Sequence, residues 1–70
     1  MAEVKVFYDR VGNTLTVWFG DPSLEHISEE TGDEVILMKD SAGKVIGFEK
    51  LNFALPHSDL LRLSFETAPA

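Results

Sequence analysis

Residues 34–51 read EVILMKDSAGKVIGFEKL, two apolar runs on either side of a short polar turn. The first run, residues 34–39, carries the apolar and β-branched residues that strands prefer, on both of its faces. The turn, residues 40–44, has Gly43 near its end, where a positive φ costs least. The return run, residues 45–51, contains Gly47, which predicts a β-bulge or the close approach of another group. This stretch predicts an antiparallel hairpin.

A second hairpin precedes it. Residues 3–9 and 14–19 both alternate between apolar and polar positions, the period of two that marks a strand. Residues 10–13, Arg-Val-Gly-Asn, form the kind of short Gly/Asn connection that turns a hairpin. The two hairpins predict an all-β or β-rich domain over residues 1–70, an antiparallel meander of four to five strands.

Two other segments leave alternatives open. Residues 24–30 fit either a short exposed strand or extended loop, which we favour, or one helical turn capped by Ser23. Beyond Pro56, residues 61–66 alternate as a strand does, although Leu61 and Phe65 are also spaced as in a helix. We favour a strand there over a short C-terminal helix begun by Ser58.

The predicted sheet has apolar residues on both faces. One face would carry Val4, Val6, Leu15, Val17, Phe19, Leu37, Ile46 and Phe48, and the other Phe7, Trp18, Ile36, Met38, Val45 and Leu51. A single small sheet cannot cover two such faces, so either the C-terminal tail or a second subunit must pack against it. Oligomerisation is a common remedy in short chains, and we expect a homodimer or larger.

Composition limits the classes of function. Seventy residues allow one small domain, and the absence of cysteine removes disulfides, thiolate metal sites and thiol nucleophiles. A net charge of −6 argues against direct binding to nucleic acid, which needs clustered Lys and Arg. Neither a signal peptide nor an apolar stretch long enough for a membrane helix is visible, so we expect a cytoplasmic protein with no membrane association.

The negative charge is concentrated in one place. Residues 21–34, here called the acidic segment, contain six acids and no Lys or Arg, while the rest of the chain has six acids and six bases. Trp18, a residue type enriched at interface hot spots, precedes this segment. The candidate partner-binding residues are therefore Trp18, Asp21, Glu25, Glu29, Glu30, Asp33 and Glu34.

Catalysis and metal binding have little support. The contiguous His57-Ser58-Asp59 holds the residue types of a catalytic triad, but adjacent loop residues rarely converge as a triad requires, so a capped turn is favoured. His26 lies among acids without a recognised ligand spacing. The turns at Asp9 and Asp40 are too poor in oxygen ligands for calcium and fit Asp side chains bonded to their own backbone. We expect no enzyme activity, no catalytic residue, no metal and no cofactor.

Two segments resemble a known family. Residues 8–17, YDRVGNTLTV, and residues 40–49, DSAGKVIGFE, are similar in order and spacing to the two signatures of domain-of-unknown-function family 2283, small β-rich prokaryotic proteins. Asn13 and Thr16 stand where that family usually has an Asp and an aromatic residue. The resemblance implies no catalytic site. Because some members are encoded beside small toxin-like proteins, it implies an antitoxin or partner-binding role.

These observations favour a non-catalytic interaction module that binds a basic protein through the acidic segment. The alternative is a structural or regulatory homo-oligomer without a basic partner, in which the acidic segment serves only solubility.

Overall fold

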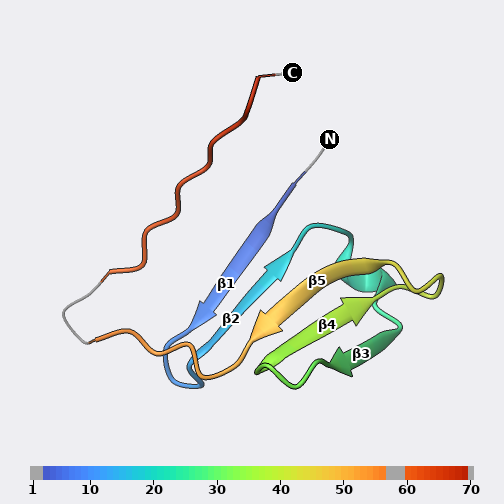
Figure 1. Cartoon of the computed structure of the whole chain (residues 1–70), viewed down its shortest axis with the longest axis horizontal. Helices are drawn as coiled ribbons and strands as arrows, with labels where there is room; N and C mark the ends of the chain where they lie inside the picture. Colours follow the sequence, from blue (N-terminus) through green and yellow to red (C-terminus); the bar gives the residue numbers. More distant parts are fainter. Residues whose placement is uncertain (1–2, 57–59, 70) are drawn as a thin grey trace.

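The computed structural model describes residues 3–56 and 60–69 and contains one five-stranded antiparallel sheet (Figure 1). The spatial order of the strands is β1-β2-β5-β4-β3. A short 3-10 helix, η1, lies between β2 and β3. The elements are β1 (Lys5–Asp9), β2 (Thr14–Trp18), η1 (Pro22–Leu24), β3 (Ile27–Glu30), β4 (Val35–Lys39) and β5 (Val45–Lys50).

Both predicted hairpins are confirmed. Strands β1 and β2 pair from Lys5 opposite Trp18 to Asp9 opposite Thr14, and β4 pairs with β5. Each turn begins with an Asp whose carboxylate accepts hydrogen bonds from backbone N–H groups further along the same turn, at 2.9–3.0 Å. Gly43 has a φ of 83°, as its place in the turn predicted. The β-rich fold class is therefore correct, and local turn chemistry explains both hairpins.

The strands are not arranged in chain order. Strands β3, β4 and β5 follow one another as a meander, whereas the hairpin β1–β2 joins them through β2 and β5. Two backbone hydrogen bonds hold the chain as it leaves the sheet, from Leu51 N–H to Glu34 C=O and from Phe53 N–H to Asn13 C=O, both at 2.7 Å. The second of them brings Phe53 edge-on to Tyr8, with ring centroids 5.6 Å apart.

Gly47 marks the junction between the two hairpins. A Cβ at this position would lie 2.7 Å from the Val17 carbonyl oxygen and 2.8 Å from the ring of Trp18, its cross-strand partner. The pairing of β4 with β5 also shifts register between Met38 and Lys39. The close approach, one of the two predicted reasons for a glycine here, is confirmed, and the shift of register lies beside it. The indole covers the gap that the glycine leaves in the sheet.

Of the alternatives left open for residues 24–30, the favoured exposed strand is confirmed. The helical turn covers only Pro22–Leu24, and the exposed strand β3 follows it. Asp21, rather than Ser23, caps the turn: its carboxylate accepts from the Ser23 N–H at 2.9 Å. The proline in the first turn fits this placement, because its missing N–H needs no partner there.

The C-terminal segment, residues 60–69, adopts neither the strand nor the helix considered from its sequence. It runs as an extended chain beyond the β1 edge of the sheet, in the direction opposite to β1 (Figure 1). Leu60, Leu63 and Phe65 are 83%, 57% and 74% exposed. A strand needs a neighbour for its hydrogen bonds, and this segment has none within the described part of the chain. The proposed cap Ser58 lies outside the described residues.

The sheet has two distinct faces, set by its register. The apolar face carries Val6, Tyr8, Leu15, Val17, Val35, Leu37 and Phe48, and the charged Lys50 and Glu29 lie on the same side. The mixed face comprises Phe7, Thr16, Trp18, Glu30, Ile36, Met38 and Glu49. Both agree with the predicted division of the strand residues except at Val45, which was expected on the mixed face but lies opposite Lys39, on the side of Leu37, because the register shifts between Met38 and Lys39.

The core is thin. Among the described residues only Met38 and Ile46 are fully buried hydrophobic side chains. Val4 and Phe19, expected in the core, flank the strands and are 49% and 48% exposed. Within the described residues, no helix has the length and apolar character needed to span a bilayer.

Candidate functional site

Strand β3 divides the acidic segment between the two faces of the sheet. Glu29 lies opposite Leu37 and Glu30 opposite Ile36, so consecutive acids point to opposite sides. Asp21 and Glu25 precede β3, while Asp33 and Glu34 lie in the turn that follows it. A stretch that is continuous in sequence therefore does not form one acidic patch.

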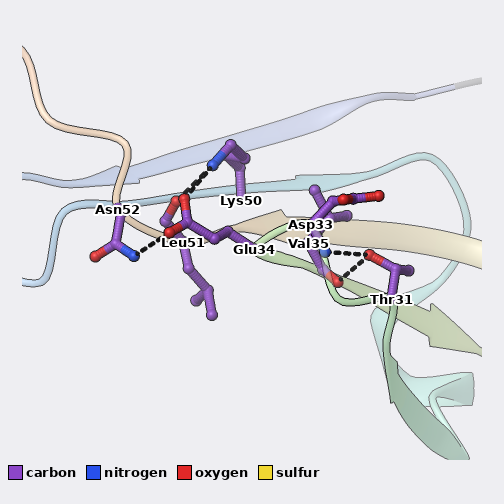
Figure 2. Close-up of polar contacts among 7 residues, drawn as sticks. All are labelled: Thr31, Asp33, Glu34, Val35, Lys50, Leu51 and Asn52. Atoms are coloured by element: carbon purple, nitrogen blue, oxygen red, sulfur yellow. Dashed lines mark hydrogen bonds and ion pairs between the residues drawn. The ribbon is translucent and has the colours of Figure 1, made fainter.

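Two of the acids are held by lysines. The Lys39 Nζ lies 2.7 Å from Glu29 Oε2, and the Lys50 Nζ lies 3.2 Å from Glu34 Oε2. Figure 2 shows that Glu34 also accepts a hydrogen bond from the Asn52 amide, at 3.0 Å. The Asn52 hydrogen bond, followed by Lys50, holds the pKa of Glu34 below its ordinary value. These carboxylates stabilise the end of the sheet and are partly neutralised.

Two more acids support local structure. Asp21 accepts from both the backbone N–H and the hydroxyl of Ser23, and these bonds lower the pKa of its carboxyl group. Glu25 accepts from the Ser28 hydroxyl at 2.6 Å. The sequence predicted both residues as part of a partner-binding surface. In the structure, Asp21 caps the helical turn and Glu25 bonds to a residue just after it.

Glu30 and Asp33 are the remaining acids. Both side chains are exposed and have no ion pair among the described residues. The turn between them is shaped by Thr31, whose hydroxyl donates to the Val35 carbonyl oxygen at 2.9 Å (Figure 2). The Thr31 N–H donates to the same oxygen at 3.0 Å. Of the acidic segment, these two carboxylates are the ones most available to a partner.

A small pocket adjoins Glu30. It has a volume of about 130 Å³, well below the several hundred cubic ångströms typical of small-molecule sites. Its walls combine carboxylate-bearing and aliphatic residues, a setting suited to a single side chain better than to a substrate. The lining residues are Glu30, Gly32, Glu34, Val35, Ile36 and Leu51.

The mixed face brings Trp18 and Glu30 onto the same side of the sheet and adds an acid that sequence reasoning missed. Glu49 lies opposite Ile36, which in turn lies opposite Glu30. Its carboxylate accepts from the Thr16 hydroxyl at 3.2 Å. Glu49 falls outside the acidic segment, and only the pairing of β5 with both β2 and β4 reveals its position. The alternation of residues 45–51 was the one sequence signal that could have placed Glu49 on the same face as Gly47.

Metal-ligating side chains do not gather among the residues that the structure describes. No group of three or more His, Asp or Glu side chains is placed to hold a metal ion among them. His26 is exposed at the start of β3. His57 and Asp59, with Ser58 between them, lie outside the described residues. The site is therefore a surface of acids, hydroxyls and apolar side chains.

The fold and this surface define a small, single-sheet β protein with an acidic and aromatic face. The sequence matches the family of proteins of unknown function DUF2283 over residues 5–53, which is more than half of the chain. The chain belongs to that family. The matched region runs from the first residue of β1 to the Phe53 that closes against Tyr8. No curated protein and no solved structure matches the chain.

Proposed function

We propose that this chain is a non-catalytic protein-interaction module. The observation that carries the proposal is the single layer of the sheet, in which the described residues bury only two hydrophobic side chains. Sheets of this size gain stability by packing against a second layer. A partner that covers one face would supply that layer, so binding and completion of the core would be the same event.

The mixed face supports a basic protein as the partner. Trp18 and Ile36 would supply apolar contact area, and Glu30 and Glu49 lie on either side of Ile36. The pocket next to Glu30 has the size and lining to receive the alkyl stem of a lysine whose ammonium group pairs with a carboxylate. Charge would govern the association rate and the choice of partner, while apolar contacts would supply affinity.

An antitoxin-like role is the form that this proposal takes if the basic partner is a toxin. Its support is the resemblance to a family in which some members are encoded beside toxin-like proteins. We place the encounter in the cytoplasm, in keeping with the absence of cysteine.

The test is a pull-down from host lysate followed by mass spectrometry, comparing the wild type with the double variant Glu30→Gln, Glu49→Gln. We expect the wild type to capture a basic protein. The double variant should fail to capture it, because the two substitutions remove the charges that attract it. Glu3→Gln is the matched control, because it removes an exposed carboxylate beyond the opposite edge of the sheet. Equal capture by all three proteins would contradict the electrostatic part of the proposal.

A structural or regulatory homo-oligomer is the second candidate, and the apolar face favours it. The strand residues of this face are only half-buried, and its flanking lysines, Lys39 and Lys50, are already paired with Glu29 and Glu34. A face that is apolar and locally neutral is suited to meet its own copy. A monomeric mass by light scattering at micromolar concentration would exclude this candidate.

A further inference from the structure

Strand β1 is an edge strand that lacks a neighbour on one side within the described chain. Such an edge presents a row of free backbone N–H and C=O groups. Its central residue, Phe7, is 66% exposed. The C-terminal segment, meanwhile, is extended, unpaired and apolar at alternate positions. The molecule therefore contains both an open sheet edge and a strand-like segment without a sheet.

We propose that residues 62–66 of one copy pair antiparallel with β1 of a second copy, in the register that places Lys5 opposite Glu66 and Asp9 opposite Arg62. This register sets opposite charges against each other at both ends of the five-residue overlap. Between them, Val6 faces Phe65 and Tyr8 faces Leu63. Opposite charges and apolar groups are the favourable cross-strand partners in an antiparallel pair.

The register also respects the two faces of the sheet. Val6 and Tyr8 belong to the apolar face, so Phe65 and Leu63 would extend that face by one strand. Phe7, on the mixed face, would lie opposite Ser64. A slip of one residue would turn Leu63 and Phe65 to the mixed face and separate both charge pairs.

The charges select the direction of the added strand. A parallel pairing of the same two five-residue stretches would set Lys5 beside Arg62 and Asp9 beside Glu66, which are repulsive pairs. An antiparallel slip of two residues in either direction leaves neither Lys5 nor Asp9 opposite a charge. Of these arrangements, only the proposed one satisfies both charges and both apolar positions.

A second copy, rather than the same chain, is the occupant that the structure favours. Within the described residues of one chain the segment makes no hydrogen bond to β1 and leaves its apolar side chains exposed. Pairing with a second copy would join two chains, which the thin core of a single short chain favours. Exchange between two copies forms each contact twice about a two-fold axis and brings the sheets together. This inference does not depend on a basic partner or on the acidic segment.

Cysteine cross-linking tests the register directly, because the natural chain contains no cysteine. Phe7→Cys combined with Ser64→Cys places two thiols directly opposite each other, about 4.5–5.5 Å apart between Cα atoms, which is within disulfide reach. Under mild oxidation we expect a covalent dimer on a non-reducing gel. The control, Phe7→Cys with Phe65→Cys, points the thiols to opposite faces and should not cross-link.

The other outcomes overturn the proposal. An internal disulfide in a monomer would show that the segment closes on its own chain. Equal cross-linking of the control, or of Phe7→Cys alone, would show a different register or contact. Absence of any disulfide in the double variant would show that the two strands do not meet.

Charge reversal provides an independent measurement on the full-length chain by sedimentation equilibrium. Lys5→Glu and Glu66→Lys should each weaken dimerisation about tenfold, and the double variant should restore it. Glu66→Lys is the decisive variant, because it lowers the net negative charge and would promote association if only overall repulsion mattered. Unchanged or tighter association of Glu66→Lys, or failure of the double variant to recover, would overturn the pairing.

Discussion

The two edges of the sheet differ in how they are protected from further pairing. Strand β3 is short, fully exposed and ends in two consecutive acids, Glu29 and Glu30. Strand β1 presents Phe7, 66% exposed, between Val6 and Tyr8 and carries its charges only at its ends. Charged and short edges resist the addition of another strand, whereas apolar edges invite it. The difference indicates that β1 is the edge at which this protein can be extended.

The lysines near the two edges differ in how closely they are paired with acids. On the β3 side, Lys39 and Lys50 reach across the sheet and hold Glu29 and Glu34. On the β1 side, the one ion pair of Lys5 among the described residues is with Glu3, at 3.7 Å with both side chains largely exposed. An exposed pair of that kind contributes little and gives way readily to a better partner. The lysines near β3 therefore already have close partners, while Lys5 on β1 has only a weak one.

Placing an acid within β1, as β3 already has, should have the largest effect on self-association. We expect Phe7→Glu to weaken self-association about a hundredfold, because each symmetric dimer would carry two carboxylates at the centres of its paired edges, where charged side chains oppose the addition of a strand. The fold should survive, since the side chain is 66% exposed in the single chain. Sedimentation equilibrium measures the association and circular dichroism the fold. Ile27→Glu, the same change on the β3 edge, is the control and should leave association unaltered; equal weakening by both would erase the distinction between the edges.

The centre of the sheet, where the two hairpins meet, differs from both edges because a change there should affect the stability of the fold itself. Gly47→Ala would bring a Cβ within 2.7 Å of the Val17 carbonyl oxygen and 2.8 Å of the Trp18 ring. We expect it to lower the free energy of unfolding by about 2 kcal/mol, as overpacking does. Urea denaturation measures the loss.

A second variant separates the two contacts at Gly47. Trp18→Leu removes the ring but leaves the Val17 carbonyl oxygen in place. The cost in stability of Gly47→Ala should therefore be smaller in a Trp18→Leu background than in the wild type, but it should not disappear. Full recovery would show that the backbone contact is unimportant, and no loss in Gly47→Ala would show that the sheet has room at this position.

The sequence was sufficient for features governed by neighbouring residues. Alternation located both hairpins, and Asp40 and Gly43 identified the turn between β4 and β5 by their own backbone chemistry. Alternation also separated Val17 from Trp18 and so assigned most strand residues to the correct face. Gly47 was recognised as a special position, although the ring that covers it comes from a strand about thirty residues earlier.

Features that depend on the pairing of distant strands could not be predicted from the sequence. The joining of β2 to β5 brings Glu49 beside Thr16, and no local pattern announces that contact. The acidic segment appeared to be one surface because its charges are contiguous, yet alternation in β3 sends Glu29 and Glu30 to opposite faces. The strand periodicity of residues 61–66 is genuine, but periodicity alone supplies no hydrogen-bonding neighbour.

Removing the acids of β3 should make that edge resemble β1. We expect Glu29→Thr with Glu30→Thr to increase concentration-dependent association several-fold, because threonine favours strands and no longer repels an approaching edge. Light scattering over a range of concentrations measures this effect. Glu25→Gln with Asp33→Asn removes the same charge outside the strand and is the control. If both double variants associate equally, net charge and not edge protection is responsible.

The smallest expected effect concerns the anchoring of the β3–β4 turn and appears in the dependence of stability on pH. Asn52 and then Lys50 hold the pKa of Glu34 below its ordinary value of 4.5. A carboxyl group whose pKa is depressed in the folded state contributes stability above its unfolded pKa, and that contribution is lost as the pH falls through the folded pKa. Glu34→Gln should therefore lower the thermal midpoint slightly at pH 7, and the difference from the wild type should shrink progressively below about pH 4.5. Lys50→Met should reduce the same pH dependence, since it removes the cation that favours the ionised form. A difference between wild type and Glu34→Gln that stays constant from pH 7 to pH 3 would mean that the turn is held by the Asn52 hydrogen bond and its backbone alone, without a contribution from the charge of Glu34.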